Sequence, residues 1–157
     1  MSREGDIQRI LELPHRYSDA ANRRDWDDFE RVYAVDARWQ VPGVNVDLRG
    51  RANIRKWVVE SFQGSDFFMQ LIGGQRLVRY EPEVANVYTY FQAFSRRFDG
   101  TGFHYIMVYD DEMTRNDGIW EFSHRIGHFL YQENRAPTGV NMPFPELRTF
   151  GSRSAAG

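Results

Sequence analysis

Cysteine is absent from the 157-residue sequence, which excludes disulfide bonds and thiolate chemistry. No apolar run approaches the roughly 18 residues of a membrane-spanning helix, and the opening stretch MSREGD is not a signal peptide. An excess of one charge is also lacking, since 20 Lys and Arg residues face 22 Asp and Glu residues, and this balance argues against a nucleic-acid-binding surface. These absences predict a cytoplasmic protein that binds neither nucleic acid nor membrane.

Motifs for several common chemistries are missing as well. The sequence has no phosphate-cradling glycine loop and no GxSxG nucleophile motif. His124 and His128 have the four-residue spacing of a helical metal site, but they lie in a strand-like run, where four residues span about 13 Å. We therefore expect no metal, and we interpret both as structural histidines on an apolar strand face.

Aromatic residues are abundant, at 15% of the chain, with 12 Phe, 8 Tyr and 4 Trp. Such a composition is typical of a protein that lines an apolar cavity, and it is equally typical of a large aromatic core. The length fits one domain with a substantial core. Composition alone does not choose between the two interpretations.

The first 64 residues have helical periodicity. One helix is predicted from a row of apolar residues at three- and four-residue steps, and Pro14 within it should kink or restart the helix. Asp25 is a good N-cap for a second helix, a short strand is predicted at residues 37–43, and a third helix should run over residues 52–62 and end at Gly64. The row of the first helix is Ile7, Ile10, Leu11, Pro14, Tyr17 and Ala21.

From Phe67 onward the pattern changes to strands. Four strand-like runs cover residues 67–80, 84–98, 103–113 and 119–132, and Asp-Gly dipeptides at 99–100 and 117–118 are hairpin signals. Gly73 and Gly74 indicate a bulge that bends the first of these strands. The order predicts an α+β fold: three N-terminal helices packed on a strongly curved, mostly antiparallel sheet in a cone-shaped barrel. Residues 1–135 form the predicted single domain, and residues 136–157 a C-terminal tail that is a possible lid.

Strand parity predicts where a cavity lies. Tyr88, Tyr90 and Phe94 share one face of their strand, and the next strand presents a face with Met107 and Tyr109. Aromatic rings with hydroxyl tips are typical of a pocket for an apolar ligand with a few polar anchors. These five residues, together with Trp39 of the short strand, are the predicted substrate-binding residues. The alternative is a tyrosine-rich solvent or oligomer face.

The stretches RYSDAANRRDWDDFERVYAVDARW, MQLIGGQRL and YDDEMTRNDGIWEFSHR, in this order, resemble the SnoaL-like, or scytalone dehydratase-like, group of the nuclear transport factor 2-like superfamily. The resemblance covers about residues 5 to 132. It implies a conical α+β barrel that holds a small, mostly apolar substrate without a cofactor. It also implies a homodimer or homotrimer.

The resemblance assigns roles residue by residue. Dehydratases of the group pair a histidine just before the LIGG segment with an aspartate on the first helix, and Gln70 and Asn22 stand at those places here. Neither amide can take up a proton at physiological pH, so they would orient a substrate oxygen or a water. Tyr17 matches a tyrosine of the group and would donate a hydrogen bond or a proton, and His104 is the nearby histidine able to move one.

Arg125 matches an arginine that is frequent in the group, and Asp111 and Glu121 are its candidate partners. The expected function is that of a cofactor-free lyase, isomerase or cyclase acting on a small apolar or polycyclic substrate, of polyketide-, terpenoid- or steroid-like character. The alternative is a non-catalytic ligand-binding or structural subunit of the same fold, like the small subunit of ring-hydroxylating dioxygenases.

Overall fold

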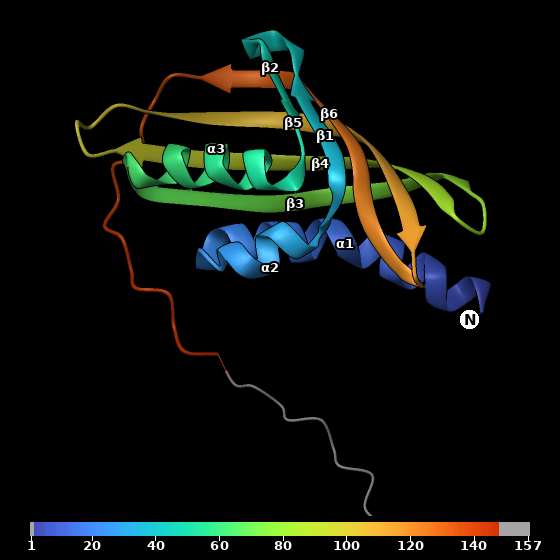
Figure 1. Ribbon diagram of the computed structural model, residues 1–157. Helices are drawn as coiled ribbons and strands as arrows, with labels where there is room; N and C mark the ends of the chain where they lie inside the picture. The colour runs from blue at the N-terminus through green and yellow to red at the C-terminus, as the bar shows by residue number, and fades with distance from the viewer. Residues whose placement is uncertain (1, 148–157) are drawn as a thin grey trace, which may run out of the picture.

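A computed structural model describes residues 2–147 of the chain (Figure 1). Three helices, a short 3-10 segment and six strands make up the fold. The helices are α1 (Arg3–Arg23), α2 (Trp26–Arg31) and α3 (Arg51–Gln63), and the 3-10 segment is η1 (Pro42–Val44). The strands are β1 (Tyr33–Val41), β2 (Val46–Arg49), β3 (Ser65–Tyr80), β4 (Val84–Arg97), β5 (Gly102–Asn116) and β6 (Ile119–Glu133).

Local signals explain where the first two helices begin and end. Ser2 caps α1 by accepting a hydrogen bond from the amide of Gly5 at 3.2 Å, and Asp25 caps α2 by accepting one from the amide of Asp28 at 3.0 Å. Between the two helices, Arg24 takes a left-handed conformation with a φ of 58°. Helix α1 continues through Pro14, so the predicted restart is wrong. Pro14 lies on the buried face, where packing holds the helix across the missing amide hydrogen bond.

The strands form a single sheet with the order β2-β1-β6-β5-β4-β3. Only the β1–β6 pair is parallel, and the other pairs are antiparallel. A register shift between Ile72 and Gly74 confirms the predicted bulge, and the turn at Asp117 and Gly118 has φ angles of 49° and 81°, as a tight type I′ hairpin requires. The predicted α+β class with a curved, mostly antiparallel sheet is confirmed. The sheet is open rather than closed into a barrel, because β2 and β3 are its two edges.

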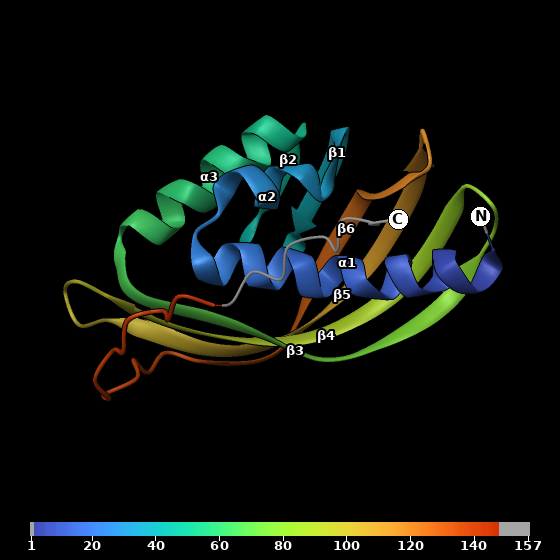
Figure 2. The same ribbon diagram turned by 90° about the horizontal axis from the view of Figure 1, so that it is seen from below.

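All three helices lie on one side of the curved sheet (Figure 2). Helix α1 crosses the concave face, and its Tyr17 packs against Phe29, Tyr33 and Phe122 with ring centroids 5.4 to 6.3 Å apart. The aromatic residues therefore do both things that the composition suggested. One group fills the core between α1 and the sheet, and another lines a cavity farther along the same face.

Asp6 joins the start of α1 to the sheet. Its buried carboxylate accepts hydrogen bonds from the hydroxyl of Tyr80 at 3.1 Å and from Nε1 of Trp120 at 3.3 Å, and Arg115 lies 3.5 Å away. Burial by itself would raise the pKa of Asp6, but the two hydrogen bonds and the guanidinium charge outweigh it, and the pKa is lowered.

A lowered pKa predicts how this contact responds to acid. The stabilisation should be fully present above the ordinary Asp pKa of about 3.9 and should be lost as the pH falls through the lowered value of the folded state. We expect Asp6→Asn to lower the free energy of unfolding at neutral pH, and the difference from the native chain to shrink below about pH 4. Urea titrations of both proteins from pH 3 to pH 8 measure it. A difference that stays constant over this range would contradict the assignment.

The C-terminal tail leaves the end of β6 and passes the ends of β3 and β4. Arg96 donates hydrogen bonds to the carbonyl oxygens of Pro137 and Gly139 and to Oδ1 of Asn141, at 2.8 to 3.1 Å. Val140, Met142, Phe144 and Leu147 are exposed, and residues 148–157 of the predicted tail lie outside the described residues. A lid conformation stays a prediction. Within residues 2–147 no helix is both long enough and apolar enough to cross a membrane.

Candidate active site

A cavity of about 320 Å³ lies between the concave face of the sheet and helices α1 and α3. Apolar side chains make up most of its wall. Its deeper residues are buried, whereas Val44, Trp57, Ser61, Arg97 and Gln132 are exposed and form its mouth. The remaining wall residues are Tyr17, Trp39, Val41, Val46, Val58, Phe62, Ser65, Phe68, Gln70, Ser95, Phe103, Tyr105, Met107, Tyr109 and Phe129.

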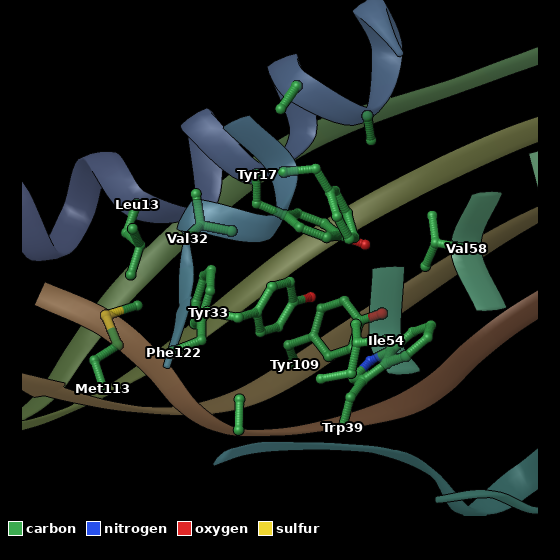
Figure 3. Packing of buried hydrophobic residues seen from close by; sticks show 14 of the residues in the cluster. Leu13, Tyr17, Val32, Tyr33, Trp39, Ile54, Val58, Tyr109, Met113 and Phe122 are labelled. Atoms are coloured by element: carbon green, nitrogen blue, oxygen red, sulfur yellow. The ribbon is translucent and has the colours of Figure 1, made fainter. Parts of the chain in front are cut away.

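Several hydrogen-bond donors reach this cavity. In Figure 3, the hydroxyl groups of Tyr17 and Tyr109 and the indole nitrogen of Trp39 point toward the same end of the core, beside Val58 of α3. Burial raises the pKa of Tyr105 and of Tyr109 above the ordinary value, so both phenols stay protonated at physiological pH. They can donate hydrogen bonds to a ligand, and they do not act as bases.

Tyr109 owes its position to its neighbours. Its ring stacks on Phe91 with centroids 4.8 Å apart and an interplanar angle of 5°. On β6, Gly127 leaves room for it, because a Cβ at that position would lie only 2.7 Å from Cε1 of Tyr109. The phenol is therefore fixed on both sides before any ligand arrives.

Two buried polar atoms of the cavity wall lack a partner. Nε1 of Trp39 is a donor and Oε1 of Gln70 is an acceptor, and neither makes a hydrogen bond within the described residues. An unsatisfied buried polar group costs about 1–3 kcal/mol, so such atoms are expected where a ligand or an ordered water completes the site. Besides the tyrosine hydroxyls, the wall thus offers these two unpartnered atoms, a donor and an acceptor, to a bound molecule.

Asn22 stands behind Gln70 and holds its backbone. Nδ2 of Asn22 donates to the carbonyl oxygen of Gln70 at 2.7 Å, and Oδ1 accepts from the amide nitrogen of Gln70 at 2.8 Å. The hydroxyl of Ser18 donates to the same carbonyl at 3.0 Å. Asn22 is therefore next to Gln70, as the resemblance implied, but its amide is occupied by the backbone and is not among the wall residues. It positions Gln70.

Replacing Asn22 tests this role. We expect Asn22→Asp to lower the free energy of unfolding by about 1–3 kcal/mol at pH 8, because an ionised carboxylate cannot donate to the carbonyl of Gln70. The neutral carboxyl can donate and accept as the amide does, so folding should raise the pKa of the introduced group. The stabilisation should then be present below about pH 4 and lost as the pH rises through the raised pKa.

The matched control is Asn22→Ala, whose cost should not depend on pH because it introduces no titratable group. Urea denaturation of both variants between pH 4 and pH 8 separates the two behaviours. If both variants lose the same free energy of unfolding at every pH, the proposed role of Asn22 in holding the backbone of Gln70 is contradicted.

A buried ion pair packs against the rings of Tyr17 and Tyr109. Nε of Arg125 donates to Oδ1 of Asp111 at 2.6 Å, and both side chains are fully buried. The guanidinium carbon lies 4.3 Å from the ring centre of Tyr17 and 4.0 Å from that of Tyr109. Asp111 is thus the partner of Arg125, which was one of the two alternatives. The guanidinium of Arg125 therefore holds the rings of Tyr17 and Tyr109 in place by cation–π contacts.

Comparisons with known proteins agree with the fold. Residues 4–126 match the sequence model described as the SnoaL-like domain. The chain belongs to the SnoaL-like domain family. The comparison with curated proteins gave no match.

Solved structures show the same fold at low identity. A hexachlorocyclohexane dehydrochlorinase of type 2 is 18% identical, with a TM-score of 0.78 over 92% of this chain and 97% of that one. The type 3 dehydrochlorinase from Novosphingobium barchaimii is 19% identical, with a TM-score of 0.77 over 91% and 97% of the two chains. A protein provisionally assigned as a scytalone dehydratase, from Novosphingobium aromaticivorans, is 16% identical, with a TM-score of 0.74 over 87% and 95%.

For this SnoaL-like chain, sequence parity chose the right face of β5 and the wrong face of β4. Met107 and Tyr109 line the cavity, as predicted, and so do Tyr17, Trp39 and Gln70. Tyr88, Tyr90, Phe94 and His104 do not line it. In β4 the buried face carries Ala85, Val87, Phe91 and Ala93, so the cavity side is the face with the small or plainly apolar residues.

The convex face holds the remaining predicted residues. The ring of His104 stacks on Phe94 with centroids 4.3 Å apart, and Nε2 of His104 lies 3.3 Å from Oε1 of Gln92. Tyr90 is exposed on this face. His104 is therefore separated from the cavity by the sheet, and the predicted proton-moving role does not fit its position.

His124 has a partner outside the cavity. Nε2 of His124 lies 2.7 Å from Oε1 of Gln40 on β1. Within residues 2–147 no group of three or more His, Cys, Asp or Glu side chains is placed to hold a metal ion.

Sequence reasoning missed part of the cavity wall. Trp57, Val58 and Phe62 reach it from α3, and Ser65 and Ser95 form a hydroxyl pair at 3.2 Å in its wall. The three-residue and four-residue steps within α3 indicate that Trp57, Val58 and Phe62 share one face of the helix. They do not indicate that this face borders a cavity. The structure supplies that information.

Proposed function

We propose that this SnoaL-like protein is a cofactor-free enzyme of the lyase, isomerase or cyclase type, acting on a small, mostly apolar substrate that carries an oxygen function. The observation behind the proposal is the convergence of neutral donors and of two unpartnered polar atoms in one apolar cavity. Pockets of this kind, with few polar groups in an apolar wall, are typical substrate sites.

The proposed chemistry relies on hydrogen bonds rather than on a base. Tyr17 and Tyr109 donate to the substrate oxygen as it gains negative charge, Trp39 supplies a further donor, and Oε1 of Gln70 accepts from a hydroxyl of the substrate. A preorganised donor at a developing oxyanion is worth about 2.7–4 kcal/mol. No carboxylate and no imidazole stands among the described wall residues. A cyclisation or rearrangement that needs shape and charge stabilisation therefore suits the site better than base-driven elimination.

The solved relatives support a lyase-type reaction as the starting point, because two of them are dehydrochlorinases and a third is assigned as a dehydratase. A second candidate function is non-catalytic ligand binding. It is favoured by the same lack of a carboxylate or imidazole in the described wall. We include a homodimer or homotrimer in the proposal, since the convex sheet face exposes Leu71, Tyr90, Leu130 and Tyr131.

The test begins with the protein purified without denaturation. Native mass spectrometry should detect a retained small molecule, and the same method reports the number of subunits. The released compound, together with hexachlorocyclohexane and scytalone, is then incubated with the protein in the absence of any cofactor. Conversion of a compound supports the enzyme. A retained compound that is recovered unchanged, with no turnover of the others, supports ligand binding and contradicts the enzyme.

A further inference from the structure

One charge stands at the mouth of the cavity. Arg97 is the sole charged residue of the described cavity wall, and its side chain is exposed. It also borders an adjoining groove, which is formed with Gly100, Thr101, Gly102, Phe103, Asn134 and Ala136. Arg97 therefore lies where the apolar interior opens to solvent.

The adjacent residue on β4, Arg96, has partners for its charge, whereas Arg97 does not pair with a carboxylate within the described residues. Arg96 is paired with Asp66 at 3.0 Å and donates to the C-terminal tail. None of the ion pairs found within residues 2–147 involves Arg97, whereas its backbone amide is fixed by a 2.7 Å hydrogen bond to the carbonyl of Thr101. The anchored backbone presents a cation that the described part of the chain does not neutralise by a direct contact.

Asp99 is the carboxylate whose pKa is affected by the charge of Arg97. Oδ1 of Asp99 accepts hydrogen bonds from the amide and the hydroxyl of Thr101 at 2.9 and 2.6 Å. These bonds, and then the nearby guanidinium of Arg97, lower the pKa of Asp99. The carboxylate is thus engaged in its own turn, and the donors of Arg97 remain available to a ligand.

We infer that the substrate is an organic carboxylate, whose apolar body fills the cavity and whose anionic group meets Arg97 at the mouth. The inference rests on the proposed use of this cavity as the substrate site, and it adds the substrate class. A guanidinium matches a carboxylate with two parallel hydrogen bonds, which gives orientation as well as affinity. The neutral oxygen function of the substrate then meets the unpartnered atoms of the wall, Nε1 of Trp39 and Oε1 of Gln70.

The experiment measures binding and does not depend on turnover. Matched carboxylate and carboxamide probes built on benzene, cyclohexane and naphthalene rings are titrated by calorimetry, with the fluorescence of Trp39 and Trp57 as a second signal. In at least one pair the carboxylate should bind about tenfold more tightly than the amide, the low end for a charge-assisted hydrogen bond at an exposed site. Because the contact is exposed, added salt should reduce the difference.

Three variants locate the effect. Arg97→Gln should remove the preference for the carboxylate by weakening carboxylate binding far more than amide binding, and Arg97→Lys should keep part of the preference. Arg76→Gln, at an exposed position of β3 outside the cavity wall, removes the same charge and should leave the preference intact.

The outcomes separate the two proposals. Amides that bind as tightly as carboxylates, or a preference that survives Arg97→Gln, would overturn the carboxylate inference and leave the cavity as a ligand site. Failure of every probe to bind would overturn both the inference and the proposed function.

Discussion

Replacing Arg125 by methionine should lower the free energy of unfolding by about 3–5 kcal/mol, the usual cost of breaking a buried ion pair from one side. Arg125 is fully buried and bonds both carboxylate oxygens of Asp111, at 2.6 and 3.2 Å. Without it, the one side-chain donor left to the buried carboxylate within residues 2–147 is the hydroxyl of Thr89 at 2.9 Å. Equilibrium urea denaturation measures the change.

The electrostatics of the pair give the reason for the size of the effect. Burial would lower the pKa of Arg125, but the carboxylate of Asp111 outweighs it and raises the pKa, so the guanidinium stays charged in the core. The variant therefore leaves one uncompensated charge. The double change Arg125→Met with Asp111→Leu should recover most of the loss, because it removes both charges and keeps the volume filled.

Arg38→Met is the matched control, because Arg38 pairs with Asp47 at 2.7 Å on the surface. Surface pairs contribute little, so this change should have a small effect. A cost at Arg125 no greater than at Arg38, or a double variant as unstable as the single one, would contradict the assigned role. The single Arg125 variant should also weaken ligand binding, since the guanidinium supports the rings of Tyr17 and Tyr109.

The helices and strands were largely predictable because each carries its own periodic signal. Long strands with alternating residues and Asp-Gly turns gave β3 to β6 to within a few residues. Strand β2 was missed because its four residues are too few for a pattern, and the turn before it depends on Asn45 at a φ of 56°. The passage of α1 through Pro14 depends on packing, which local sequence does not contain.

The site was predictable only in part, and for a physical reason. In β4 both faces carry apolar residues, so parity alone does not tell which face is concave. The choice depends on which face the rest of the fold covers, and the covered face is the one with Ala85, Phe91 and Ala93. Likewise, the resemblance placed Asn22 beside Gln70, but a side-chain amide that pairs with a backbone amide leaves no mark in a single sequence.

If the proposed chemistry is right, Tyr109→Phe should lower kcat by about 100- to 1000-fold, the effect of removing one donor from a developing oxyanion. The substrate is whichever compound the retained-ligand experiment shows to be turned over. The ring of the new side chain should stay in place, because the stack on Phe91 at 4.8 Å and the guanidinium of Arg125 at 4.0 Å hold it without the hydroxyl. The loss should therefore appear in kcat, with KM little changed.

Tyr17→Phe should act in the same direction, since Tyr17 is also a buried wall residue whose ring is packed on three sides by aromatic neighbours. Tyr88→Phe, on the convex face, removes the same group outside the cavity and should leave kcat unchanged. Because burial raises the pKa of Tyr109, its ionisation should not limit the native rate up to about pH 10, the ordinary Tyr value. Equal losses in Tyr109→Phe and Tyr88→Phe would remove the phenol from the mechanism. A full rate in Tyr109→Phe would do the same, and the charge stabilisation would then have to come from the other two donors, Tyr17 and Trp39.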